Sequence, residues 1–263
     1  MENHTRGGGP RRALATGHAV PLLGFGTWQL NGAQAYRAVR VALEVGYRHI
    51  DTATGYANEH QVGAALRDSG VKREEVFVTT KCPPERVGRE LETLEESLAA
   101  LRLDFVDLWL VHWPPNGEAR PETWAAFVAA AEQEKARAIG VSNYSLAQID
   151  ELVEATGVSP AVNQIPWSPF AFDEQLASSH EERHVVLEGY SPLKRSRLDE
   201  PVLVEIAHEH GKTPAQVVLR WHLEHGVVVI PRSARRERIE ENFDLFDFAL
   251  SPAAMGRIDA LAS

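Results

Sequence analysis

Short apolar runs alternate with longer amphipathic stretches along the chain, from Leu22 to the C-terminus. This alternation is typical of repeated strand–helix units around a parallel sheet. Eight runs qualify as strands, at residues 23–27, 47–53, 76–82, 105–113, 137–143, 161–166, 185–190 and 227–231. Eight units favour a closed (β/α)8 barrel over an open doubly wound sheet, although a count alone leaves both open.

The clearest helical period lies between the third and fourth runs. Its apolar residues recur every three or four positions and predict one buried face: Val87, Leu91, Leu94, Leu98 and Leu101. Glycines follow several helical stretches, where left-handed C-caps are expected: Gly46, Gly70, Gly157, Gly211 and Gly226. Before the first barrel strand, residues 12–21 predict a β-hairpin, and residues 252–261 predict an extra C-terminal helix.

The first twelve residues are rich in glycine and basic side chains, so we expect residues 1–12 to form a flexible N-terminal arm. The remainder, 13–263, is expected to be a single barrel domain. A (β/α)8 barrel needs roughly 250 residues, which the chain supplies. Apolar residues make up 44% of the sequence and charged residues 24%, a composition typical of a globular protein with a large core.

The formal net charge of −10 indicates an acidic surface that repels phosphate backbones and anionic lipid headgroups. We therefore expect no nucleic-acid partner and no membrane partner. Cys82 is the single cysteine, which excludes an intramolecular disulfide and favours a reducing, cytoplasmic location. No stretch approaches the roughly 20 apolar residues of a transmembrane helix, and the N-terminus lacks the apolar core of a secretion signal.

Polar side chains lie at the ends of three consecutive predicted strands. The second strand carries Asp51 near its end, with Tyr56 five residues later, the third carries Lys81 and the fourth carries His112. In a barrel, the C-terminal ends of the strands converge on one mouth, where such enzymes place their chemistry. We therefore expect these four side chains to meet at one rim.

Such a set suits the reduction of a carbonyl group. A hydride added to the carbonyl carbon leaves charge on the oxygen, so a proton donor and a hydrogen-bond donor are needed there. Tyr56 would donate the proton, and Lys81 would stabilise its phenolate and bring its pKa down from roughly 10 toward neutrality. Asp51 would hold the charge of Lys81, and His112 would orient the carbonyl oxygen.

Each of these residues also has an ordinary explanation when taken alone. Asp51 or Lys81 would be half of a surface ion pair, Tyr56 a packing aromatic and His112 a core histidine. Their occurrence together on consecutive strand ends favours the catalytic interpretation.

Further motifs extend the pattern in order along the chain: GFGTW at 24–28, YRHIDTA at 47–53, TK at 80–81, VHWP at 111–114, IGVSN at 139–143, YSPL at 190–193, IPRS at 230–233 and RIEEN at 238–242. From about residue 14 to residue 261 the sequence resembles the aldo-keto reductase family. The resemblance implies a (β/α)8 barrel that reduces aldehydes or ketones reversibly with NADPH. It also implies that Tyr56 is the general acid, Lys81 and Asp51 its support, and His112 the residue that orients the substrate.

The nicotinamide cofactor must be held without a Rossmann fingerprint, because GFG at 24–26 lacks the third glycine and its helix. Ser142, Asn143 and Gln164, at the ends of the fifth and sixth strands, suit hydrogen bonds to a carboxamide, and Tyr190 suits stacking on the nicotinamide ring. Alone, these residues would equally suit strand-end capping, but the resemblance assigns them to the cofactor. It also implies contacts from the remaining motif residues Gly26, Thr27, Trp28, Asp51, Ser191 and Leu193.

A phosphate site is expected after the eighth strand, where barrels often bind phosphate. It would comprise Arg232 and Ser233 in the loop and Arg238, Glu241 and Asn242 in the next helix. Arginine forms bidentate, charge-assisted bonds to phosphate, so this set predicts a preference for NADPH/NADP+ over NADH. The family commonly has lysine where this chain has Arg232, which changes the geometry of the site but not the sign of its charge.

The substrate pocket is expected to be apolar and aromatic, with walls from Trp28, Trp113 and Trp167 beside Tyr56 and His112. Its ligand would be a small-molecule aldehyde or ketone. The connections after the fourth and seventh strands are short, at 113–122 and 191–200, and the chain ends after the last helix. We therefore expect an open, shallow pocket with broad carbonyl tolerance and fast cofactor release. Likeness to the family favours a monomer.

The sequence also raises three other interpretations. Tyr190 and Lys194 match the Tyr-x-x-x-Lys pattern of short-chain dehydrogenases, but Pro192 between them prevents the helix that this pattern needs. Eleven histidines raise the possibility of a metal-dependent hydrolase. The first strand has no His-x-His pair, however, so no metal is expected. A regulatory subunit that senses nucleotide without turnover is the remaining alternative, and steady turnover of a carbonyl would exclude it.

Overall fold

The structure is a computed structural model that describes residues 9–262. Eight strands form one parallel sheet, in the spatial order β10-β9-β8-β7-β6-β5-β4-β3. They are β3 (Phe25–Gly26), β4 (His49–Asp51), β5 (Phe77–Cys82), β6 (Leu108–Val111), β7 (Ile139–Ser142), β8 (Val162–Pro166), β9 (Val186–Tyr190) and β10 (Val228–Ile230). Each lies within one of the eight runs expected from the sequence.

The first and last strands of the sheet are also joined. The backbone N–H of Gly24 donates to the carbonyl of Val229 at 2.9 Å, and the N–H of Val229 donates to Leu22 at 2.8 Å. A parallel bridge pairs Leu23 with Val229. The sheet is therefore a closed (β/α)8 barrel, which the strand count alone left open.

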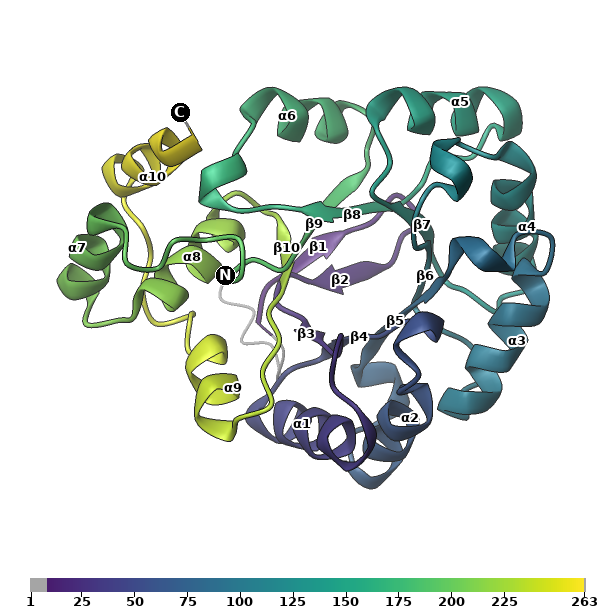
Figure 1. Cartoon of the computed structure of the whole chain (residues 1–263), viewed down its shortest axis with the longest axis horizontal. Coiled ribbons are helices and arrows are strands. Elements are labelled where there is room, and N and C mark those ends of the chain that lie inside the picture. The colour runs from purple at the N-terminus through teal and green to yellow at the C-terminus, as the bar shows by residue number, and fades with distance from the viewer. Residues whose placement is uncertain (1–8, 263) are drawn as a thin grey trace.

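Helices surround the barrel (Figure 1). They are α1 (Gly32–Val45), α2 (Glu59–Asp68), α3 (Glu90–Leu101), α4 (Pro121–Glu132), α5 (Leu146–Thr156), α6 (Glu174–Glu182), α7 (Pro201–His210), α8 (Pro214–Glu224), α9 (Arg236–Phe243) and α10 (Pro252–Asp259). Proline at the first position and Ser or Thr at the N-cap set several of the starts; Thr213, for example, forms a capping box with Gln216 ahead of α8. The extra C-terminal helix expected at 252–261 is α10, followed by the 3₁₀ turn Ala260–Ala262.

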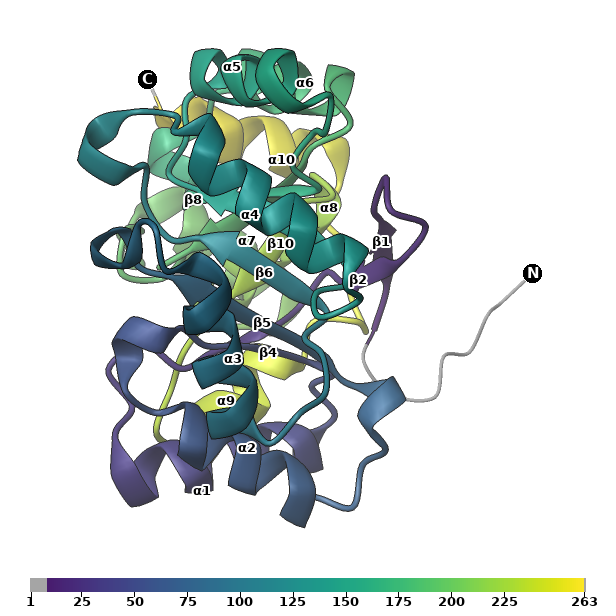
Figure 2. The ribbon, with the colours of Figure 1, turned by 90° about the vertical axis from the view of Figure 1, so that its right-hand side faces the viewer.

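A hairpin of β1 (Arg11–Ala13) and β2 (Ala19–Pro21) lies at one end of the barrel (Figure 2). Leu14 and Val20 bury their side chains in the main core, which ties the hairpin to the end where the strands begin. The hairpin starts at Arg11, so Arg11 and Arg12 are part of it rather than of the arm expected at 1–12. Residues 1–8 of that arm lie outside the described residues.

Helix α3 differs from the expected stripe at one position. Leu94, Leu98 and Leu101 are buried, as the helical period predicts, but Val87 is 44% exposed and precedes the helix. The reason is that Pro83 and Pro84 start a separate 3₁₀ turn, Pro84–Arg86, and break the period. The C-caps expected at Gly157 and Gly211 are present in left-handed conformation, with φ of 73° and 63°.

Within residues 9–262, no helix is both long enough and apolar enough to cross a membrane. Over the same residues, no group of three or more His, Cys, Asp and Glu side chains is arranged to hold a metal ion.

Candidate active site

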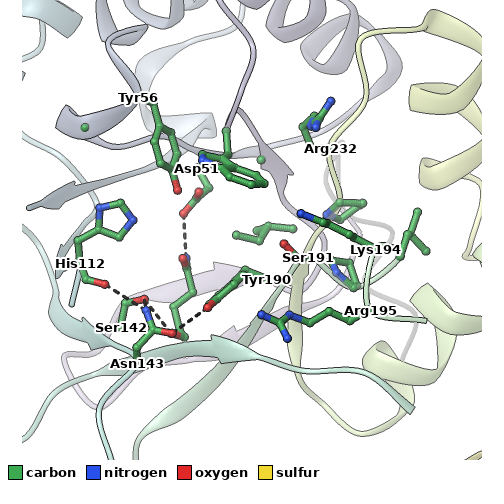
Figure 3. Close-up of a pocket in the computed structure, with 18 of the residues that line it drawn as sticks. Asp51, Tyr56, His112, Ser142, Asn143, Tyr190, Ser191, Lys194, Arg195 and Arg232 are labelled. Atoms are coloured by element: carbon green, nitrogen blue, oxygen red, sulfur yellow. Dashed lines mark hydrogen bonds between the residues drawn. The ribbon is translucent and has the colours of Figure 1, made fainter. Parts of the chain in front are cut away.

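A cavity of about 890 Å³ opens at the C-terminal ends of the strands. Its walls include Gly26, Trp28, Asp51, Tyr56, His112, Trp113, Ser142, Asn143, Gln164, Tyr190, Ser191, Leu193 and Arg232, all of which were expected in the site. Figure 3 shows Tyr56 and His112 on one side of the cavity and Lys194, Arg195 and Arg232 on the other. The cavity thus has a side that carries the expected catalytic residues and a side that is basic.

Asp51, at the cavity wall, forms a buried ion pair with Lys81. Lys81 Nζ lies 2.6 Å from Asp51 Oδ1, and both side chains are almost completely buried. Lys81 Nζ also donates to the carbonyl of Thr52 at 2.8 Å. Burial alone would lower the pKa of Lys81, but the charge of Asp51, its hydrogen bond to the ammonium and smaller contributions from neighbouring groups together outweigh burial, and the pKa is raised. The ammonium group therefore stays charged in this dry position.

Tyr56 ends the 3₁₀ turn Thr54–Tyr56 that follows β4. Thr54 fixes this turn against β5, because its hydroxyl donates to the carbonyl of Lys81 at 2.9 Å. The phenol oxygen of Tyr56 then lies 3.4 Å from Lys81 Nζ. Burial raises the pKa of Tyr56 and the charge of Lys81 opposes the rise only in part, so the net shift is upward. The expected shift toward neutrality does not occur, and Tyr56 is a protonated phenol at neutral pH.

His112 follows β6 and is held by its backbone N–H, which donates to Cys82 at 3.0 Å. Its ring meets the ring of Tyr56 edge to face, with 5.6 Å between centroids. Burial, with a smaller contribution from the charge of Lys81, lowers the pKa of His112 to about 3. The imidazole is therefore neutral and has one N–H to donate.

The residues expected to hold the nicotinamide form one hydrogen-bonded group. Tyr190 donates its hydroxyl to Asn143 Oδ1 at 2.9 Å, and Asn143 Nδ2 donates to Ser142 Oγ at 2.9 Å. Ser142 Oγ in turn donates to the backbone carbonyl of Gln164 at 2.8 Å. Asn143 takes up a left-handed conformation, with φ of 65°, directly after β7.

The expected phosphate site is only partly assembled. Arg232 lines the cavity and donates to Gln29 Oε1 at 3.0 Å. Ser233 interacts with the backbone of Arg235. Arg238 is 2.7 Å from Glu241, whose carboxylate also accepts from Thr213. Asn242 is buried in α9. Of this set, Arg232 is the one that lines the cavity.

The structure differs from the sequence expectation at Trp167. Its side chain is 1% exposed and belongs to a second apolar cluster, where it packs edge to face on Phe172 at 5.9 Å. It does not line the cavity because its ring is packed in that cluster, which also contains Val217 and Trp221 of α8. Trp28 and Trp113 do line the cavity and are 41% and 48% exposed. Thr27 is fully buried, with its hydroxyl on the carbonyl of Asp51.

Sequence reasoning missed three residues of the site. Lys194 and Arg195 line the cavity from the connection after β9. Their Nζ and guanidinium groups lie 5.3 Å and 5.8 Å from the ring centroids of Trp28 and Tyr190. Three basic residues within 194–197 of an acidic chain were a usable signal. The third missed residue of the site is Glu188, which is fully buried and accepts a hydrogen bond from Gln164.

Comparison with known proteins gives a consistent result. The profile of the Aldo/keto reductase family matches residues 22–263. An aldo-keto reductase of Mycolicibacterium smegmatis is 44% identical over 246 residues, which cover 92% of this chain and 90% of the relative. The methylglyoxal reductase DkgA of Escherichia coli is 41% identical over 252 residues, covering 94% and 92% of the two chains.

Solved structures agree. The crystal structure of an aldo/keto reductase from Brucella melitensis superimposes with a TM-score of 0.92 at 41% identity, over 96% of this chain and 99% of that one. The aldose reductase from Schistosoma japonicum superimposes with a TM-score of 0.89 at 33% identity, over 97% and 93%.

Proposed function

The chain belongs to the aldo/keto reductase family, and from that premise we propose that it reduces the carbonyl group of a small aldehyde or ketone with NADPH, reversibly. The observation that carries the proposal is the position of Tyr56, whose phenol lies at the cavity and within 3.4 Å of the buried Lys81–Asp51 pair.

In this proposal Tyr56 is the general acid. Its raised pKa keeps the phenol protonated at neutral pH, which is the state that can donate to a developing alkoxide. The ammonium of Lys81 stabilises the phenolate left after the proton transfer. Asp51 keeps that ammonium charged and in place at 2.6 Å. In the reverse direction, the same phenolate would accept the proton of an alcohol.

His112 would hold the carbonyl oxygen. Since its pKa is lowered to about 3, the ring is neutral and donates one N–H without competing as an acid. Its edge-to-face contact with Tyr56 directs both side chains to the same part of the cavity. A carbonyl oxygen that accepts from both donors would be polarised along the line of the proton transfer.

The chemistry of the walls fits a nicotinamide dinucleotide. Ser142, Asn143 and Gln164 offer amide and hydroxyl groups, and Tyr190 offers a ring face, while Lys194, Arg195 and Arg232 give the far side of the cavity a positive charge in a protein of net charge −10. When bound, the reduced nicotinamide supplies the hydride. The phosphates would lie on the basic side, with Arg232 at the 2′-phosphate. Gly26, Thr27, Ser191, Leu193, Ser233, Arg238, Glu241 and Asn242 complete the proposed cofactor set.

Consumption of the cofactor tests the function. A panel of methylglyoxal, aromatic and aliphatic aldehydes, ketones, quinones and sugars should reveal steady oxidation of NADPH, followed at 340 nm. Methylglyoxal heads the panel because DkgA, a relative at 41% identity, is named as a methylglyoxal reductase. Oxidation of no more than one equivalent of NADPH with every carbonyl would instead indicate a nucleotide-sensing subunit and overturn the proposal.

A further inference from the structure

Glu188 is a buried carboxyl group with no part in the proton transfer described above. It lies in β9, its side chain is fully buried, and it faces Gln164 across the β8–β9 pair, where the two residues are register partners. Glu188 Oε1 accepts a hydrogen bond from Gln164 Nε2 at 2.9 Å. Within the described residues, Oε2 has no hydrogen-bond partner. A buried carboxyl is costly, so its presence beside the site calls for a role.

The amide of Gln164 lies between two carboxyl groups. Its Nε2 donates to Asp51 Oδ2 at 2.9 Å as well as to Glu188. The other oxygen of Asp51 pairs with the ammonium of Lys81, so Asp51 acts as an acceptor toward Gln164. The nitrogen of the amide must therefore face the two acids, and both of its hydrogens are used. Gln164 lines the cavity, and its side-chain carbonyl oxygen Oε1 is the polar atom of the amide that can face it.

The charge of Glu188 is compatible with this arrangement. Burial, together with the nearby charge of Asp51, raises the pKa of Glu188 to about 8, while Lys81 and the bond from Gln164 oppose the rise. The group is thus mostly a neutral acid at pH 7 and accepts through its carbonyl oxygen. No second anion then competes with Asp51 for Lys81.

We propose that Glu188 is a positioning residue, which together with Asp51 fixes the amide of Gln164 so that its carbonyl oxygen accepts from the carboxamide N–H of the nicotinamide. Glu188 itself touches neither cofactor nor substrate, and acts through Gln164. The proposal rests on the proposed function, since it requires a nicotinamide cofactor in the cavity. Removing the acceptor at position 188 would release one hydrogen of the amide and let it turn.

The test compares two substitutions at position 188. Glu188→Gln keeps an oxygen that accepts from Gln164, whereas Glu188→Met has a similar length and no such acceptor. Dissociation constants are measured from the quenching of tryptophan fluorescence. Glu188→Gln should bind both cofactors within about twofold of the wild type, and Glu188→Met should weaken NADPH and NADH by roughly the same three- to tenfold, the effect of one hydrogen bond.

A substitution of Gln164 distinguishes a positioning role of Glu188 from a general loss of structure. In a Gln164→Leu background, Glu188→Met should add less than twofold, because the amide through which Glu188 acts is gone. Thermal unfolding checks that the variants fold, and Glu188→Val, a better strand former, replaces Met if needed. The proposal is overturned if Met weakens binding no more than Gln does, or if its effect is undiminished in the Gln164→Leu background.

Failure of the underlying function has a different signature. If the wild-type protein binds neither NADPH nor NADH, the proposed function fails and the role of Glu188 fails with it. If the wild type binds and turns over while Glu188→Met is unaffected, only the role of Glu188 is lost.

Discussion

Arg232 and Arg238 were both expected at the 2′-phosphate, but their surroundings differ. Arg232 lines the cavity and bonds the neutral side chain of Gln29, whereas Arg238 is 2.7 Å from the carboxylate of Glu241. A phosphate would have to compete with Glu241 for Arg238. Because a charge-assisted bond is worth about 1.5–3 kcal/mol, Arg232→Ala should raise the KM for NADPH by roughly ten- to hundredfold, and Arg238→Ala by less.

The KM for NADH, which lacks that phosphate, should change little in either variant. Arg236→Ala is the matched control, because Arg236 lies in the same helix as Arg238 but pairs with Glu44 and Glu240 on the outer surface. If Arg232→Ala raised the KM for NADPH and the KM for NADH equally, the 2′-phosphate would have to bind elsewhere.

Single residues were predictable where a motif marked them and not where they depend on packing. Asp51, Lys81 and His112 stand at strand ends, and the barrel brings such ends together. Glu188 lies within a strand, and its contact with Gln164 depends on the register of two neighbouring strands. Trp167 was misplaced for a similar reason, since its position after β8 fits a pocket wall and a core contact equally well.

At the scale of elements, the sequence predicted the eight strands and the terminal elements because the apolar runs and turn signals are strong and local. It did not predict closure, which depends on hydrogen bonds between segments about 200 residues apart, such as Gly24 and Val229. The helical spacing of apolar residues also gave a wrong prediction at Val87, because two prolines break the helical pattern before α3 begins.

The connection 191–200 between β9 and α7 sets the access of a cofactor to the cavity. Short as it is, it lines the cavity with residues 191–195, and Lys194 Nζ lies 5.3 Å from the ring centroid of Trp28. A cation–π contact at an exposed site is worth about 0.5–1 kcal/mol, which slows dissociation only a few-fold. We therefore expect cofactor release not to limit turnover.

Stopped-flow mixing of the NADPH-loaded enzyme with saturating carbonyl should give a linear decrease in NADPH absorbance from the first turnover. Lys194→Met should leave the steady-state rate within about twofold. A rapid burst of one equivalent followed by a slower steady rate would contradict the argument, because it would show that release of product or cofactor is the slow step.

For the whole molecule, buried neutral histidines predict a loss of stability in acid. Burial lowers the pKa of His49 and His112 to about 3 and that of His222 to about 4. Below the unfolded-state pKa of roughly 6.5, the unfolded chain takes up protons that the folded chain does not. The stabilising contribution is thus present above about pH 6.5 and is lost as the pH falls toward 3–4.

Each of these three histidines should lower the free energy of unfolding by about 1 kcal/mol for each unit by which the pH falls below 6. Urea unfolding between pH 7 and pH 5 measures this slope. His222→Gln should make the slope shallower, and His60→Gln, a change at an exposed position of α2, should leave it unaltered. A free energy of unfolding that is flat over this range in the wild type would contradict the prediction.

The monomeric state and the cytoplasmic location stay predictions.

The central claim is that Tyr56 supplies the proton for carbonyl reduction by NADPH. Tyr56→Phe removes the phenol oxygen and keeps the ring that packs on His112. The most direct test measures, on one preparation of this variant, the dissociation constant of NADPH by fluorescence and kcat for the best carbonyl of the panel. Because the variant loses the general acid that Lys81 supports, we expect a kcat at least roughly a hundredfold lower than that of the wild type. The affinity for NADPH should stay within about twofold of the wild type. A variant that keeps more than about a tenth of the wild-type kcat would contradict the account.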